Sequence, residues 1–216
     1  LVEVTRYSFL FMVAYALVAR AVLRAERGKA HQAQFRYMKL KQQVNPHFLF
    51  NSLNILDCLV CEQRTEQASA YIHKLAGIYR YMLQNEEETL VRLREEMAFV
   101  GMYVDLLQVR FPEGFRVETD ISDEAMNRHV LPCSVQLLIE NAIKHNSVGA
   151  DRPLVIRIVA VAEAVTVSNN LQLKVSGNPS TRVGLNYIRQ QYLDLSGIPI
   201  GIRRTDTEYC VTLPLL

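Results

Sequence analysis

The feature that most constrains the fold is a change of sequence pattern near residues 86–92. Before this point, apolar residues recur at steps of three and four, as they do on amphipathic helices. After it, short β-branched runs alternate with helical stretches. A helical part followed by a mixed part predicts two domains and an α+β fold class. The 216 residues are enough for each part to bury a core of its own.

The first part is predicted to be a helical hairpin. Helical periodicity covers residues 22–62, interrupted by Pro46, and resumes over residues 66–85. Two consecutive helices with a short connection favour an antiparallel arrangement. Because such a hairpin leaves an apolar stripe uncovered, we expect two copies to pair as a dimeric four-helix bundle.

The second part is predicted to mix helices with strands. A helix over residues 93–111 ends at Pro112-Glu113-Gly114. Further helices are expected over residues 131–146 and 183–195. The expected strands cover residues 115–121, 154–161, 165–167, 198–203 and 209–213. We therefore divide the chain into a membrane-proximal segment (1–30), dimerisation helices (31–88) and a mixed domain (89–216).

The N-terminal segment contains an uncharged, mostly apolar stretch over residues 7–19, between Arg6 and Arg20. A membrane span needs about 20 apolar residues, and this stretch is shorter. The basic residues that follow it suit the cytoplasmic end of a span; they are Arg20, Arg24, Arg27 and Lys29. Two interpretations stay open, a membrane-associated segment and an amphipathic helix that packs on a partner.

Composition excludes several classes of protein. Half of the residues are hydrophobic and 21% are charged, which is typical of a globular chain rather than a disordered one. A net charge of +2 gives no basic surface for nucleic acid, so no nucleic-acid partner is expected. The four cysteines are too few and scattered for a disulfide framework and favour a reducing compartment. Cys58 and Cys61 have CxxC spacing, but the lack of a second such pair in the sequence disfavours a zinc site.

The first chemical motif is the segment QVNPHFLFNSLN over residues 43–54. Helical spacing places Gln43, His47, Asn51, Asn54 and Cys58 on one polar stripe. Pro46 crowds the preceding turn and predicts a kink one residue before His47. An outward-facing imidazole that is partly neutral at pH 7 can act as a nucleophile. The alternative is a surface histidine beside a structural kink.

The second motif is the segment PCSVQLLIENAIKHN over residues 132–146. One helical face is apolar and carries Val135, Leu138, Ile139 and Ala142. The other face carries Gln136, Glu140, Asn141, Lys144 and His145. Carboxylate and amide oxygens suit Mg²⁺, and a lysine one turn away suits a phosphate oxygen. The pattern predicts a metal–triphosphate site in which a carboxylate and an amide of this face hold the metal, the alternative being a solvated helix face.

These two motifs resemble those of a known family. Residues 45–54 resemble the phosphoacceptor box, close to QxNPHFLFNxLN, of the LytS/YehU-type sensor histidine kinases. Residues 132–146 resemble their N-box, LQPLVENAIKHG, and residues 91–111 are similar to the segment that links the two. The resemblance runs from residue 42 to the end. It implies a dimeric bundle with a phosphorylated histidine, followed by a GHKL-type α/β sandwich ATPase domain.

The resemblance also implies roles for single residues. His47 matches the phosphoacceptor, and Asn51 stands one turn away, where it could orient the imidazole. Asn141 matches the asparagine that helps to hold Mg²⁺, and Glu140 and Lys144 match its neighbours at the metal and phosphates. His145 falls in the same box. ATP and Mg²⁺ are the implied substrate and cofactor.

The glycine-rich boxes of the family are altered here. Asn169 stands where the family has an aspartate that accepts a hydrogen bond from adenine, and Leu171 stands in the place of a glycine. An asparagine carbonyl can still accept that bond, with a loss of about 1 kcal/mol relative to a charged acceptor. A subset of the family has a comparable NN-L-x-x-K pattern. The second box keeps Thr181, Gly184 and Leu185, which we assign to the nucleotide site.

Together these features predict a sensor histidine kinase that autophosphorylates His47 from Mg-ATP. The expected partners are a second copy of the chain and a response regulator, which the resemblance suggests is of the LytTR type. The expected location is the inner membrane, with this part of the chain on the cytoplasmic side. The alternative is a pseudokinase that binds nucleotide poorly and acts as a dimeric signalling module.

Overall fold

The computed structural model describes residues 46–174 and 183–216. Residues Ser52–Leu216 form one compact unit, and the unit before it is described only from Pro46 to Asn51. The predicted membrane-proximal segment (1–30), its apolar stretch (7–19), the turn that Pro46 was expected to kink, and Thr181 lie outside the described residues. Within the described ranges, no helix combines the length and the apolar character needed to span a bilayer.

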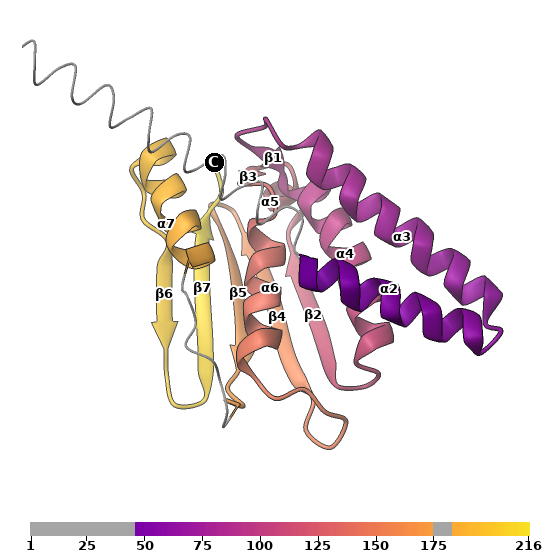
Figure 1. Cartoon of the computed structure of the whole chain (residues 1–216). Coiled ribbons are helices and arrows are strands. Elements are labelled where there is room, and N and C mark those ends of the chain that lie inside the picture. The colour runs from indigo at the N-terminus through magenta and orange to yellow at the C-terminus, as the bar shows by residue number, and fades with distance from the viewer. Residues whose placement is uncertain (1–45, 175–182) are drawn as a thin grey trace, which may run out of the picture. The chain divides into compact units, whose positions relative to one another are not determined.

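The hairpin consists of helix α2 (Pro46–Cys61) and helix α3 (Thr65–Gln84), joined by residues 62–64. The two helices run antiparallel, as predicted for this part of the hairpin, while residues 22–45 of the first predicted helix lie outside the described residues (Figure 1). Tyr71 and Ile78 of α3 are buried within the unit. Large apolar side chains nevertheless remain exposed on both helices; they are Phe50, Leu53, Val60, Ile72 and Leu83. The dimeric four-helix bundle that would cover such residues stays a prediction.

Helix α4 (Leu93–Arg110) packs along α3. A Cβ atom on Gly77 of α3 would lie 2.8 Å from Met102 Sδ, so the glycine permits a close approach of the two helices. Strand β1 (Val91–Arg92), which directly precedes α4, pairs with β3 (His129–Val130). These two-residue strands, and the short helix α5 (Asp123–Met126), were not predicted.

The central sheet has five strands in the order β2-β4-β5-β7-β6. Their bounds are β2 Phe115–Ile121, β4 Leu154–Val161, β5 Ala164–Asn170, β6 Gly201–Arg204 and β7 Glu208–Pro214. Strands β2 and β4 are parallel, and the other three pairings are antiparallel. The sheet is therefore mixed, and the structure confirms the predicted α+β fold class.

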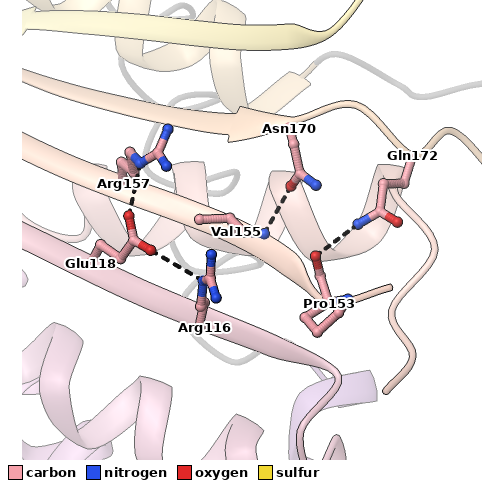
Figure 2. Close-up of polar contacts among 7 residues, drawn as sticks. All are labelled: Arg116, Glu118, Pro153, Val155, Arg157, Asn170 and Gln172. Carbon is pink, nitrogen blue, oxygen red and sulfur yellow. Dashed lines mark hydrogen bonds and ion pairs between the residues drawn. The ribbon is translucent and has the colours of Figure 1, made fainter. Parts of the chain in front are cut away.

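Alternating side chains divide the sheet into two faces. Leu154, Ile156, Ile158 and Ala160 of β4 are 0% exposed, whereas Arg157 and Val159 between them are exposed. Helices α4, α6 (Ser134–His145) and α7 (Val183–Ser196) lie over the buried face (Figure 1). The open face is polar in part. There, the Glu118 carboxylate pairs with Arg157 at 2.7 Å and with Arg116 at 3.1 Å (Figure 2).

Three element bounds differ from the predicted ones by three residues each. Helix α6 begins at Ser134 rather than at residue 131, because Cys133 has a left-handed backbone with φ 59°. Strand β5 extends beyond residue 167 to Asn170, because its pairing with β7 continues to Asn170↔Glu208. Strand β6 begins at Gly201, later than the predicted residue 198.

Candidate functional site

Helix α6 presents the polar face that its sequence predicts, with one correction. Val135, Leu138 and Ile139 are buried as expected. Gln136, predicted on the polar face, is also buried, with 6% of its surface exposed. Its Nε2 donates to the Glu140 carboxylate at 3.1 Å, and its side chain is hydrogen-bonded to Tyr103 of α4. The hydrogen bond from Gln136 therefore fixes the position of the Glu140 carboxylate.

The remaining residues of this face lie in the second half of α6. Glu140, Asn141 and His145 are half-buried, and Lys144 is exposed. In the described ranges, no three His, Cys, Asp or Glu side chains gather as a metal cage. Mg²⁺ commonly takes one or two protein oxygens and completes its shell with water and phosphate oxygens. The Glu140 and Asn141 pair fits an ion that is shared with phosphates.

Asn169 lies near the end of β5 and is 5% exposed. Its Nδ2 donates to the backbone carbonyl of Asn170 at 2.8 Å, so Oδ1 is the atom suited to accept from an amino group. At the end of β5, a side chain replaces a backbone acceptor in the pairing with β4. The Asn170 Oδ1 accepts from Val155 N at 2.8 Å (Figure 2). The two asparagines thus end the strand with fixed orientations.

The segment after β5 is joined to the end of α6 by several hydrogen bonds. The Asn146 side-chain oxygen accepts from Gln172 N at 2.8 Å, and Ser147 N donates to Gln172 O at 2.7 Å. Gln172 Nε2 also donates to the Pro153 carbonyl at 3.1 Å (Figure 2). These bonds join the C-terminal end of α6 to the segment that follows β5, so the two elements end at the same edge of the sheet, although the motifs lie in separate parts of the sequence.

A basic cluster forms at the C-terminal end of α6, from Lys144, His145 and Lys174. Lys174 Nζ donates to the carbonyl oxygens of Ile143 and Lys144, each at 3.1 Å, and so satisfies free carbonyls of the last turn. Burial lowers the pKa of His145, and the charges of Lys144 and Lys174 lower it further. These effects favour the neutral form of the His145 imidazole, and the two lysines supply the positive charge that suits an anionic ligand.

The predicted phosphoacceptor residues lie on α2. His47 is in the first turn of α2, and its side-chain surroundings lie outside what the structure describes. Asn51, one turn further on, is half-buried. Asn54 and Cys58, predicted on the same stripe, are exposed. Cys61 is exposed as well, and both thiols of the CxxC pair are free.

Gly184 and Leu185 lie in the first turn of α7, and both are half-buried. Helix α7 is anchored by Tyr192, which is 0% exposed. The Tyr192 hydroxyl accepts from Leu131 N at 3.4 Å, just before α6. Helices α6 and α7, which carry two of the predicted boxes, are therefore held to each other.

Two hollows in the described part of the chain lie away from these residues. One, of about 490 Å³, is lined by Arg128, Glu163 and residues near the last strand. The other, of about 200 Å³, lies between helices and is lined by Leu59, Tyr71 and Lys74 among others. The predicted nucleotide residues line neither hollow.

Sequence reasoning did not single out Tyr103 or Lys174 as parts of this site. Tyr103 carries no signal of its own, since helical spacing marks it as an ordinary core residue. Lys174 had a signal in the NN-L-x-x-K pattern, which places a cation four residues after Asn170. Its contact with α6 depends on the tertiary fold.

Comparison with known proteins gives consistent similarities. Residues 35–115 match the family model for histidine kinases. The sensor protein LytS of Bacillus cereus is 39% identical over 106 residues, which are 49% of this chain and 18% of that protein. LytS of Staphylococcus haemolyticus is 28% identical over 190 residues, which are 81% of this chain and 32% of that protein. The chain thus spans less than a third of the length of these relatives.

Among solved structures, one described as a bacterial phosphotransferase is similar over 83% of this chain and 94% of its own, with 14% identity and a TM-score of 0.45.

Proposed function

This chain is a relative of the LytS-type sensor histidine kinases, and on that premise we propose that it is the kinase part of a two-component sensor. In the proposed reaction, His47 receives the γ-phosphoryl group of Mg-ATP and passes it to an aspartate of a response regulator. One observation carries the proposal. The Asn146–Gln172 contact joins the residue that follows α6 to the segment that follows β5, so the C-terminal ends of these two elements meet at one edge of the sheet.

The nucleotide is assigned to that edge. Asn169 Oδ1 accepts from the adenine amino group, in the role that the family gives to an aspartate. Glu140 and Asn141 hold Mg²⁺, with Gln136 supporting the carboxylate. When bound, Mg²⁺ offsets the negative charge of the phosphate oxygens. Lys144 is placed to meet a phosphate oxygen.

The start of α7 completes the proposed site. Gly184 and Leu185 lie in the first turn, where backbone N–H groups have no partner within the helix and can bind phosphate oxygens. Thr181 precedes this turn in the sequence, and we assign it to the same box. His145, whose pKa is lowered by burial first and then by its basic neighbours, adds a hydrogen-bonding group.

Transfer itself needs little chemistry from the protein beyond positioning. A neutral imidazole nitrogen of His47 forms the bond to phosphorus as the bond to the ADP oxygen breaks. Asn51, one helical turn away, orients the ring by hydrogen bonding. A homodimer would cover the exposed apolar residues of the hairpin, Leu53, Val60 and Leu83 among them.

The remaining expectations extend the same proposal. The regulator is of the LytTR type, and residues 7–19 associate with the inner membrane, so that the described domain lies on the cytoplasmic side. These assignments follow the resemblance to the LytS-type kinases.

Nucleotide affinity tests the proposal against the pseudokinase alternative, which Leu171 favours because it replaces a glycine of the family box. We expect calorimetry to detect Mg-ATP binding by the parent protein and a loss of about tenfold or more in Asn141→Ala. Asn127→Ala removes an exposed amide outside the proposed site and serves as the control, with affinity unchanged. If the parent shows no binding at millimolar ATP, the pseudokinase is favoured.

A further inference from the structure

Glu96, in the first turn of α4, is a fully buried carboxylate outside the proposed site. Its Oε2 accepts from the Tyr81 hydroxyl at 2.7 Å and from Cys133 N at 2.9 Å. Its Oε1 accepts from Val135 N at 3.0 Å and from Gln136 N at 3.5 Å. The Glu96 carboxylate therefore accepts hydrogen bonds from two other elements, the Tyr81 hydroxyl of α3 and backbone N–H groups at the start of α6.

The backbone donors to Glu96 belong to the start of α6. The first N–H groups of a helix have no partner within the helix and carry partial positive charge. Glu96 supplies both a hydrogen-bond acceptor and a negative charge at this end. Cys133, the N-cap residue, is held in its left-handed conformation beside the carboxylate. The position of the first turn of α6 is thus determined by a side chain of α4.

Tyr81 extends this link to α3, the second helix of the hairpin. Its ring stacks on Phe99 of α4, with centroids 4.3 Å apart and planes 12° from parallel. Burial first, and then the neighbouring Glu96 carboxylate, raises the pKa of Tyr81. The hydroxyl is therefore a permanent donor to Glu96. One continuous set of hydrogen bonds runs from α3 through α4 to α6.

Loss of either the Tyr81 hydroxyl or the backbone donors of α6 leaves the Glu96 carboxylate without some of its hydrogen-bond donors. A buried carboxylate that loses a donor is left with an uncompensated desolvation cost. A movement of α3 that withdraws Tyr81 therefore disturbs the same carboxylate that positions α6. Glu140 and Asn141 lie one to two turns further along α6, so a shift of the first turn is transmitted to them by a stiff helix.

We propose that Tyr81 and Glu96 are positioning residues that couple nucleotide binding on α6 to the order of α3. The inference rests on the proposed function, because it requires Mg-ATP at α6. Coupling of this kind is reciprocal, so bound nucleotide stabilises α3 as much as an ordered α3 favours nucleotide.

Amide hydrogen exchange of α3 tests the coupling in the 216-residue chain. In the parent, we expect saturating Mg-ATP to slow exchange over residues 65–84 about tenfold. Tyr81→Phe keeps the ring stack and removes the hydroxyl. This variant is expected to bind Mg-ATP while the slowing of α3 falls below about twofold.

Tyr79→Phe is the matched control. The Tyr79 hydroxyl is buried on the same helix and has no hydrogen-bond partner within the described residues. Its removal is expected to leave the ATP-dependent slowing unchanged. Glu96→Gln is the second test variant and is expected to lose the slowing as Tyr81→Phe does. If Tyr81 and Glu96 had a purely structural role, their substitution would instead speed amide hydrogen exchange over the whole domain, both with and without bound nucleotide.

The outcomes separate the inference from the function on which it rests. If the parent does not bind Mg-ATP, the proposed function fails first. If the parent binds but α3 is not slowed, or if Tyr81→Phe and Glu96→Gln are slowed as much as the parent, the inference is overturned and the proposed function stands.

Discussion

The side-chain oxygen of Asn146 accepts a hydrogen bond from the backbone N–H of Gln172 at 2.8 Å. The amide nitrogen of the same side chain donates to the carbonyl of Ala142 in the last turn of α6, also at 2.8 Å. One amide, 2% exposed, therefore joins the helix that carries the proposed metal ligands to the segment that follows the proposed adenine-binding strand.

Asn146→Ala is predicted to destabilise the domain. The substitution leaves Gln172 N without its acceptor in a buried place, which costs about 1–3 kcal/mol. Urea denaturation measures the change, and Asn186→Ala, at an exposed position of α7, is the control, expected within about 0.5 kcal/mol of the parent. Equal stability of Asn146→Ala and the control would show that the contact does not hold the two segments together.

Lys174→Met is predicted to raise the pKa of His145. The lysine charge is one of the causes that lower this pKa, after burial and Lys144, so its removal makes the imidazole easier to protonate. An NMR titration of the ring protons measures the shift. Lys74→Met is the control, because Lys74 pairs with Asp105 at 2.6 Å on α4 and is not among the groups that act on His145. An unchanged or lower pKa in Lys174→Met would contradict the basic cluster.

Glu96→Gln is predicted to change how stability depends on pH. Burial raises the pKa of Glu96 from 4.5 to about 6, against the lowering effect of its hydrogen bonds. The folded state therefore binds this proton more tightly than the unfolded state. The contribution of Glu96 to the free energy of unfolding is therefore complete below pH 4.5. About 2 kcal/mol of it is lost as the pH rises through about 6.

Denaturation at a series of pH values tests this difference. Relative to the parent, Glu96→Gln should gain about 2 kcal/mol in its free energy of unfolding between pH 4 and pH 7. If the free energy of unfolding depended on pH in the same way for the two proteins, Glu96 would have the same pKa in the folded and the unfolded state.

The sequence predicted the helical hairpin, the mixed domain and the apolar face of α6, because helical periodicity is a local property. It misplaced Gln136, since a polar residue on a helix gives no sign of whether its partner is water or the buried Tyr103. Strands β1 and β3 have two residues each, which is too short for any periodic signal.

Glu96 shows both the signal and its limit. It lies at helical spacing between Leu93 and Phe99, which are both buried, whereas Glu95 beside it is exposed. An acidic residue inside an apolar stripe could have marked a buried carboxylate. Its partners could not be predicted, because Tyr81 and Cys133 come from other elements that meet only in the folded domain.

Incubation of the protein with γ-labelled ATP and Mg²⁺ tests the central claim most directly. We predict label that is labile in acid and stable in alkali, present in the parent and in His73→Ala, which alters an exposed histidine of α3, and missing from His47→Ala. A parent that takes up no label, or a His47→Ala variant that is labelled like the parent, would contradict the assignment of His47 as the phosphoacceptor.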